Sequence, residues 1–181
     1  VGRLKRRFKR ASGCLILAKN EPAFLALQKQ FHDRLTQKTY VALVHGAVSP
    51  ETGSINAPIG RLPWNKQRFG VYPGGREAQT DYRVDHIYKH EGEDYSLLSF
   101  FPKSGRTHQL RAHAKHINHT IVADPWYAGE RTTRSDSVWC PRLFLHAAKI
   151  VFLHPITGEE IVVEAELPMD LKTVLAQLAL K

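Results

Sequence analysis

The residues best suited to chemistry in this chain lie together in the segment GRTHQLRAH, residues 105–113. Arg106 stands where a predicted strand turns into a predicted helix, and Arg111 and His113 lie within that helix. A cation at the start of a helix is opposed by the helix dipole, so Arg106 requires an anionic partner, either a carboxylate or a nucleic-acid phosphate. The segment therefore predicts an anion-binding site at a strand–helix junction. A surface arginine with a loosely held partner is the simpler alternative.

A second candidate is a zinc site, because four histidines crowd this region: His108, His113, His116 and His119. Only His113 and His116 share a face of the predicted helix, no cysteine lies nearby, and no second pair of ligands follows. We therefore expect hydrogen-bonding or surface histidines and no metal, with a metal-dependent nuclease as the third functional interpretation. The sequence also contains no nucleophile elbow around Ser12 and no common glycine motif for phosphate.

The charge of the chain is concentrated at its start. The first ten residues hold six cations and no acid, whereas the whole chain carries a net charge of +9. The remaining residues are therefore only mildly basic. A block of like charges is usually a solvated arm, but it can also hold nucleic acid by neutralising phosphates. Both interpretations of this block stay open.

Composition limits the class of protein. With 181 residues, 43% of them hydrophobic, the chain fits one globular domain or part of a larger one. No apolar run approaches the ~18 residues of a membrane-spanning helix, so none is predicted. The two cysteines, Cys14 and Cys140, fit a reducing compartment. We expect a monomer in the cytoplasm or, because the basic start resembles a presequence, in an organelle. The N-terminal valine suggests a missing upstream segment.

The elements around the chemical segment follow from hydrophobic spacing. Alternating or β-branched runs predict strands over residues 13–18, 39–48, 78–88, 94–102, 143–155 and 159–167. Helices are predicted over 21–34, 107–117 and 169–180, with Phe24, Leu27, Phe31 and Leu35 as the apolar face of the first. Residues 49–75 read as a loop or loose hairpin, and 131–139 as a loop. The fold class is therefore α+β, with a mixed, largely antiparallel sheet and flanking helices.

The segment SGRTHQLRAHAKHINHTIVADPWYAG, residues 104–129, resembles the signature of the RluA family of RNA pseudouridine synthases. It departs from the family pattern at Thr120, at Ala123 and by one extra residue before Gly129. Four other segments resemble family strands in family order: SGCLILAKN (12–20), KTYVALVHG (38–46), AQTDYRV (78–84) and RLFLHA (142–147). The resemblance implies a pseudouridine synthase-like catalytic domain over residues 12–181 that lacks the family's first strands. Residues 1–11 then form a divergent basic segment.

The resemblance also implies a reaction. In this family a uridine is flipped out of the RNA, an aspartate attacks as nucleophile, the N-glycosidic bond breaks, and uracil rejoins through C5 without metal or organic cofactor. By resemblance Tyr40 stacks on the target base, Arg106 pairs with the aspartate, and Leu145 lines the apolar side of the pocket. The partner is RNA, either rRNA or tRNA, and ribosomal precursor particles are a further candidate. The residues expected to bind RNA are Arg61, Lys66, Arg68, Arg76, His108, Gln109, Arg111 and His113.

The family's nucleophile is absent from its expected place. The family loop reads His-Arg-Leu-Asp before Thr-Ser-Gly, whereas this chain reads Gly-Arg-Leu-Lys, five further residues, and Ala-Ser-Gly. Lys5 lies near the aspartate's position, or Phe8 if the alignment has no gap, and no acid occurs before Glu21. We therefore expect this chain to be inactive. The alternative is a catalytically silent RNA-binding paralogue, such as a ribosome-assembly factor. Genuine divergence and an altered N-terminus both explain the change.

Overall fold

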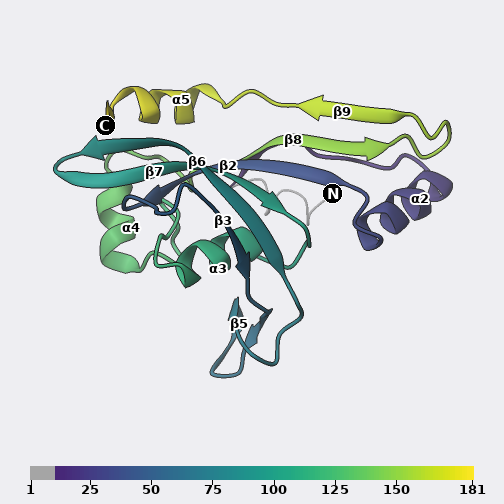
Figure 1. Cartoon of the computed structure of the whole chain (residues 1–181), viewed down its shortest axis with the longest axis horizontal. Helices are drawn as coiled ribbons and strands as arrows, with labels where there is room; N and C mark the ends of the chain where they lie inside the picture. The colour runs from purple at the N-terminus through teal and green to yellow at the C-terminus, as the bar shows by residue number, and fades with distance from the viewer. Residues whose placement is uncertain (1–10) are drawn as a thin grey trace.

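A twisted sheet organises the described part of the chain, which comprises residues 11–181 apart from the side chains of Lys66 and Gln67. Its strand pairs are antiparallel except the first, so this computed structural model confirms the α+β class (Figure 1). The strands, in spatial order, are β1 (Ser12–Gly13), β8 (Leu145–Leu153), β2 (Gln37–His45), β7 (Glu93–Pro102), β6 (Gln79–His90) and β10 (Ala179–Leu180); β3 (Thr52–Asn56) pairs with β6, and β9 (Glu160–Glu164) pairs with β8.

The centre of the sheet is apolar on both faces. Ala42, Leu43 and Val44 follow one another along β2, and all three are fully buried. Successive residues of a strand point to opposite faces, so burial of all three means that both faces are covered. Helices α3 (Gln109–His116) and α4 (Glu130–Asp136) lie on one side of the sheet and α5 (Met169–Ala176) on the other (Figure 1). No helix within residues 11–181 is long and apolar enough to cross a membrane.

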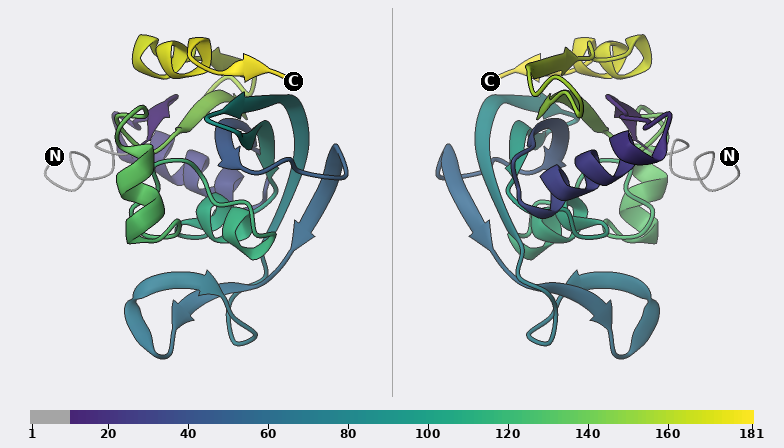
Figure 2. Two further views of the ribbon diagram at one scale, coloured as in Figure 1. Left: turned by 90° about the vertical axis from the view of Figure 1, so that its left-hand side faces the viewer. Right: turned by 90° about the vertical axis from the view of Figure 1, so that its right-hand side faces the viewer.

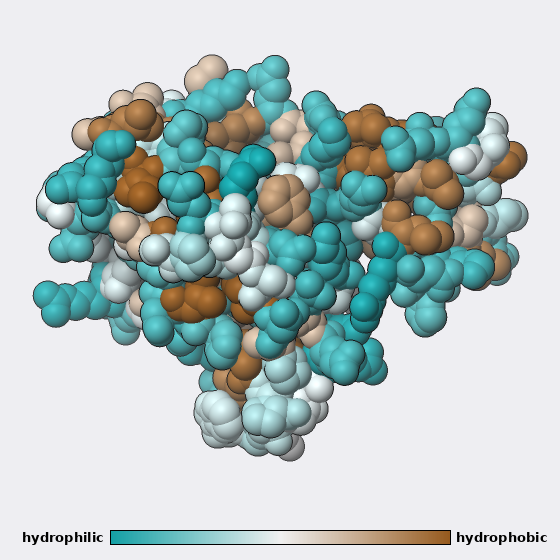
Figure 3. All heavy atoms as spheres, viewed as in Figure 1, coloured by the Kyte–Doolittle hydropathy of each residue, from teal (hydrophilic) through white to brown (hydrophobic). Residues whose placement is uncertain are grey.

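Helix α2 (Glu21–His32) lies where the sequence predicts a helix, but its predicted apolar face is wrong. Asn20 caps its first turn, and Arg34 adopts a left-handed conformation just beyond its end. Of the four predicted apolar residues only Leu27 is buried, whereas Phe24, Phe31 and Leu35 are between 44% and 56% exposed. Apolar side chains are accordingly visible on the surface around α2 (Figure 3).

Two other predictions of local structure are wrong. Residues 13–18 do not continue as a buried strand, because β1 ends at Gly13, where φ is +113°, and Leu15 and Leu17 beyond it are exposed. Residues 131–139 are not a loop, because most of them belong to α4. An acid in the first turn and an ion pair between Glu130 and Arg134, one helical turn apart, stabilise that helix.

Residues 49–75 contain more order than a loop. Strand β3 adds to the main sheet, and β4 (Ile59–Leu62) and β5 (Asn65–Val71) form a separate two-stranded hairpin. The hairpin extends away from the sheet, beyond α3 (Figure 2). The hairpin alternative is therefore confirmed. At the other end of the chain, α5 stops at Ala176 rather than continuing to Leu180, because the last residues pair with β6.

We predict that Gly13→Ala destabilises the fold more than substitution of an open glycine. A Cβ at Gly13 would collide with the backbone of Ala147, and φ of +113° is strained for any residue with a side chain. Gly158, with φ of +74° and open space around it, is the matched control. Urea unfolding should show a loss of about 1 kcal/mol for Gly158→Ala and roughly 3 kcal/mol for Gly13→Ala. Equal losses would contradict the close approach of β1 to β8.

Candidate active site

Two of the predicted catalytic residues, Tyr40 and Leu145, lie on the same face of the sheet. Tyr40 on β2 is opposite Ala147 on β8 and Phe100 on β7. Leu145 is opposite Ala42, two residues further along β2. Paired residues and alternate residues of a strand share a face, so the side chains of Tyr40 and Leu145 project in the same direction. Sheet pairing thus assembles one wall of a site from residues distant in sequence.

Strand β1 brings the N-terminal part of the described chain to this wall. Gly13 pairs with Ala147, the residue that also pairs with Tyr40, and the Cys14 backbone N–H donates to the Ala147 carbonyl at 2.9 Å. Burial raises the pKa of the Tyr40 hydroxyl, and Cys14 adds to this shift. Residues 11–14 therefore lie beside Tyr40. Lys5 lies outside the described residues.

A polar cluster fixes β1 at this position. The hydroxyl of Ser12 lies 2.9 Å from Nδ1 of His146 and accepts a hydrogen bond of 3.2 Å from the guanidinium of Arg142. The same guanidinium pairs with Asp170 on α5 at 2.6 Å. Ser12 is thus held by His146 of β8 and by Arg142, which precedes β8 and is itself paired with α5.

Arg106 is held by the buried amide of Gln109. The Arg106 backbone N–H donates to Gln109 Oε1 at 2.9 Å, and Arg106 Nε donates to the carbonyl of Glu77 at 3.1 Å. The amide of Gln109 in turn donates to Thr80 Oγ1 at 3.0 Å, which ties the start of α3 to β6. Arg106 follows the end of β7 by four residues. Its convergence with Tyr40 and Leu145 on one uridine stays a prediction.

A polar cavity of about 300 Å³ lies beside Arg106. Glu77 and Ser104, which contact Arg106 and Gln109, line it. Arg34 and Lys103 supply positive charge to the same lining. Glu77 adds a negative charge to the lining, and Lys103 is paired with Asp81 at 3.2 Å, so the cavity carries little net positive charge.

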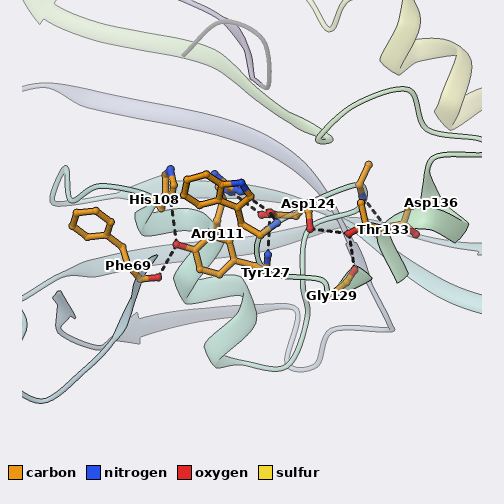
Figure 4. A network of polar contacts seen from close by, with 10 residues as sticks. Phe69, His108, Arg111, Asp124, Tyr127, Gly129, Thr133 and Asp136 are labelled. Atoms are coloured by element: carbon orange, nitrogen blue, oxygen red, sulfur yellow. Dashed lines mark hydrogen bonds and ion pairs between the residues drawn. The ribbon is translucent and has the colours of Figure 1, made fainter. Parts of the chain in front are cut away.

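Arg111 and Asp124 form a buried ion pair behind this cluster (Figure 4). Arg111 Nε donates to Asp124 Oδ2 at 2.7 Å and Nη2 donates to Oδ1 at 2.5 Å. Asp124 Oδ1 also accepts the backbone N–H groups of Trp126 and Tyr127, at 2.9 and 3.2 Å. The arginine is 6% exposed and the aspartate is fully buried. This pair fixes the turn after Asp124 against α3.

Tyr127 extends the network to the β4–β5 hairpin. Its hydroxyl donates to the carbonyl of Phe69 on β5 at 2.7 Å and lies 3.1 Å from Nδ1 of His108 (Figure 4). Burial raises the pKa of Tyr127 to about 12, so the hydroxyl keeps its proton at neutral pH. The Arg111 guanidinium carbon lies 4.9 Å from the centre of the Tyr127 ring. The hairpin is therefore attached to α3 through a neutral donor.

Three residues predicted to contact RNA are inside the protein. Gln109, Arg111 and His113 are 4%, 6% and 0% exposed. His113 lies with Nδ1 2.9 Å from Thr80 Oγ1 and Nε2 3.0 Å from the Ala57 carbonyl, and burial lowers its pKa. Their polar atoms are used within the fold, and direct RNA contact by these three residues stays a prediction. Their role is to position other residues.

The other residues predicted to bind RNA are more accessible. Arg61, Arg68 and Arg76 are exposed, on the β4–β5 hairpin and directly after it. Arg61 also stacks on Phe69, with 5.1 Å from its guanidinium carbon to the ring centre. His108 is half-buried beside Tyr127. The side chain of Lys66 lies outside the described part of the structure. RNA contact by these residues stays a prediction.

The histidine cluster points in different directions. His113 faces β6, and His119 lies 2.8 Å from the His45 carbonyl. His108 contacts Tyr127, and His116 lines a cavity on the exposed side of α3. In the part of the chain that the structure describes, no three acidic, histidine or cysteine side chains gather closely enough to hold a metal ion. The metal-dependent nuclease therefore has no described ligand set.

Sequence reasoning did not identify the structural acids of the site. Asp124 carries the buried network, and Asp136, which is 2% exposed, accepts the Ala123 backbone N–H at 2.8 Å. Asp136 Oδ2 also lies 3.1 Å from His45 Nε2. For Asp124 a local signal exists, since an aspartate commonly accepts backbone N–H groups two or three residues ahead. Asp136 lies in a segment that reads as a polar loop, so no signal identified it.

We predict that Asp124→Asn strongly destabilises the protein. The substitution leaves the buried guanidinium of Arg111 without its counter-ion, which typically costs about 3–5 kcal/mol. The control is Arg134→Gln on α4, whose ion pair with Glu130 is about 80% exposed and contributes little. Urea unfolding of both variants measures the difference. A stability of Asp124→Asn close to that of Arg134→Gln would contradict the importance of the buried pair.

We predict that Tyr127 contributes to the loss of folding stability at high pH. Because its folded pKa is raised from 10 to about 12, the folded state keeps a proton that the unfolded state loses between these values. Stability from this group is therefore complete below pH 10 and falls as pH rises toward 12, by at most about 1.4 kcal/mol per pH unit. Tyr127→Phe should lose about 1 kcal/mol at pH 8 and show a shallower fall at pH 11. Tyr72→Phe serves as control and should follow the parent chain in urea unfolding at both pH values.

Comparison with known proteins agrees with the geometry. The family model described as RNA pseudouridylate synthase matches residues 2–116, more than half of the chain. An uncharacterized RNA pseudouridine synthase of Chloroflexus aurantiacus is 42% identical over 167 residues, covering 92% of this chain and 50% of the relative. Ribosomal large subunit pseudouridine synthase D of Zymomonas mobilis is 34% identical over 175 residues, covering 94% of this chain and 54% of the relative. The chain thus spans about half the length of these curated relatives.

Solved structures show the same fold. Human RNA Pseudouridylate Synthase Domain Containing 1 superposes with a TM-score of 0.75 at 25% identity, covering 98% of this chain and 77% of that one. Human RNA Pseudouridylate Synthase Domain Containing 4, at 19% identity, shares the fold with a TM-score of 0.67 over 88% of this chain and 69% of its own. The family match, the relatives and the fold agree with the RluA-type motifs, and the chain belongs to the RNA pseudouridylate synthase family.

Proposed function

We propose that residues 12–181 form the catalytic domain of an RNA pseudouridine synthase of the RluA type, an isomerase that converts uridine to pseudouridine in structured RNA. The observation that carries this proposal is the wall formed by Tyr40 and Leu145, with Gly13 paired beside it. Ser12 and Gly13 correspond to the residues that follow the family's catalytic loop. Ser12 and Gly13 therefore lie beside the residues that would hold the base.

In the proposed reaction the wall receives a flipped uridine. Flipping costs a few kcal/mol of lost stacking, which Tyr40 offsets by stacking on the base while Leu145 covers its apolar edge. Burial raises the pKa of Tyr40, so its ring stays uncharged next to an anionic strand. Arg106 pairs with the family aspartate and keeps it ionised. Exposed arginines of the hairpin hold the RNA backbone.

The chain as written lacks the acid that this reaction requires at Lys5, and we propose that it is inactive. Two acids within the family-like segments, Asp124 and Asp81, could in principle substitute for it, but Asp124 is buried with both oxygens engaged. Asp81 on β6 pairs with Phe101, whereas its neighbour Tyr82 pairs with Phe100, which faces the Tyr40 side. Asp81 therefore projects from the opposite face. These placements favour the alternative of a catalytically silent RNA-binding protein.

The partner of either form is RNA, and we propose rRNA or tRNA as its class. One relative bears a name that refers to the large ribosomal subunit, which makes ribosomal RNA or precursor particles the first substrates to test. We further propose that the protein acts as a monomer in the cytoplasm, or in an organelle if its start serves as a presequence. No metal or organic cofactor enters the proposed reaction.

Tritium release from RNA labelled at uridine C5 tests catalysis directly, because C5 loses its hydrogen when the new bond forms. The chain as written should release no tritium but retain RNA in a filter-binding assay. Replacing Gly2 to Ala11 with His-Arg-Leu-Asp-Arg-Glu-Thr, together with the family's preceding strands, should restore release. Lys5→Asp alone should not restore release, because the longer loop of this chain would still misplace the carboxylate. A displacement of ~1 Å can cost ~100-fold in rate.

The matched control carries asparagine in place of the aspartate in the restored loop and should bind RNA without releasing tritium. Turnover by the unmodified chain would contradict the proposed inactivity. In that case Glu77→Gln should be examined next, because the backbone of Glu77 contacts Arg106 and its side chain lines the polar cavity. Absence of RNA binding by every form would contradict the proposed function.

A further inference from the structure

A second cavity, of about 470 Å³, lies between the β4–β5 hairpin and α3. Its volume falls within the range of ordinary ligand pockets, about 300–1,000 Å³. We name it the aromatic cavity, and its lining includes Trp64, Arg68, Phe69, Lys115, His116 and Trp126. The polar cavity beside Arg106 shares none of its lining residues.

The aromatic cavity lies on the side of α3 that faces away from the sheet and from the wall formed by Tyr40 and Leu145. Leu110, His113 and Ala114 of α3 are buried, and His113 contacts Thr80 on β6. Ala112, Lys115 and His116 line the cavity instead. Residues three and four apart share a helix face, so these two sets lie on different faces of α3. A molecule in the aromatic cavity therefore does not occupy the place of the flipped uridine.

The walls of the cavity combine aromatic rings with positive charge. Trp64 is 74% exposed although it is a large apolar residue, and Phe69 and Trp126 are partly exposed beside it. Arg68 and Lys115 are exposed cations, His116 is a third group able to carry positive charge, and the lining includes no acid. Aromatic rings that stack on a base and cations that bind its phosphate are the usual combination for an unpaired nucleotide.

The hydrogen-bond network described above holds this cavity in shape. Tyr127, itself part of the lining, donates to the Phe69 carbonyl and thereby fixes β5 over α3. The guanidinium carbon of Arg111 lies 5.6 Å from the Trp126 ring centre, so the indole is supported by a residue that Asp124 holds in place. A preorganised aromatic wall spends little conformational entropy when a base stacks on it.

We propose that the aromatic cavity binds one unpaired nucleotide of the RNA, separate from the target uridine. The base of this nucleotide stacks on the aromatic wall, and its phosphate pairs with Arg68 and Lys115. This inference rests on the proposed RNA-binding function and adds a second point of attachment. Two attachment points on opposite sides of α3 recognise an RNA by the distance between two unpaired nucleotides. The cavity thus provides selectivity for RNA shape without reading the target base.

The test is an abasic scan of an RNA stem–loop, measured by fluorescence anisotropy with the full chain. Each loop nucleotide is replaced in turn by an abasic residue, which keeps the phosphate and removes the base. At one position the parent chain should bind about tenfold more weakly, as expected for a lost base–aromatic stack. Trp64→Ala should weaken binding of the intact loop by a similar factor and should no longer respond to the abasic change at that position.

Matched variants separate this effect from general loss of charge or apolar surface. Phe24→Ala removes an aromatic side chain of 52% exposure from α2 and should leave the abasic profile unchanged. Lys115→Gln should reduce the salt dependence of binding by about one phosphate contact, whereas Lys89→Gln, an exposed cation on β6, should not. Because Trp64 is largely exposed, its variant should fold as the parent chain does, which urea unfolding verifies.

Two outcomes would overturn the inference, and they are distinguishable. If the parent chain binds the stem–loops but Trp64→Ala keeps the parent abasic profile, the cavity does not hold a nucleotide and the proposed function stands. The cavity would then suit another kind of partner, such as a protein. If the parent chain binds no RNA at all, the proposed function and the nucleotide site fail together.

Discussion

The guanidinium of Arg111 is buried together with the carboxylate of Asp124, and several other features of the site depend on this pair. Removing two charges from water is costly unless their geometry and hydrogen bonding are nearly complete. Here one carboxylate accepts two bonds from the guanidinium and two more from backbone N–H groups. The pair therefore holds the following turn in one conformation. That turn supplies Tyr127, which fastens the hairpin, and Trp126, which the same guanidinium supports.

The sheet provides the complementary constraint. Strand pairing places Tyr40 and Leu145 on one face and sets the short parallel strand β1 beside them. Gly13 permits this approach because any Cβ there would collide with the Ala147 backbone. A hydrogen bond from Arg142 and the proximity of His146 keep Ser12 in register with β8. The position of residues 12–14 beside Tyr40 is thus determined by backbone geometry.

The contacts described for the site are made among residues 12–170, and they maintain the family's architecture there. The wall of the site, the buried amide of Gln109 and the ion pair of Arg111 are made from residues that hold one another. None of these contacts uses a residue before Ser12. In the function proposed above, binding of RNA and isomerisation of uridine have different structural requirements, so loss of the acid would remove the second and spare the first. The nucleotide site that we propose in the aromatic cavity would add a second contact to the RNA.

The sequence by itself determined the central strands, the positions of α2 and α3 and the family motifs, because periodicity and motifs are properties of contiguous residues. Only the tertiary structure decided which polar residues of the family motif are buried. Arg111 and His113 read as exposed cationic groups, but their partners Asp124 and Thr80 come from other segments, and burial follows from those contacts. The apolar residues of α2 show the converse: spacing predicts a buried face, yet the described part of the structure covers only Leu27. Burial depends on what packs against an element, and local sequence does not contain that information.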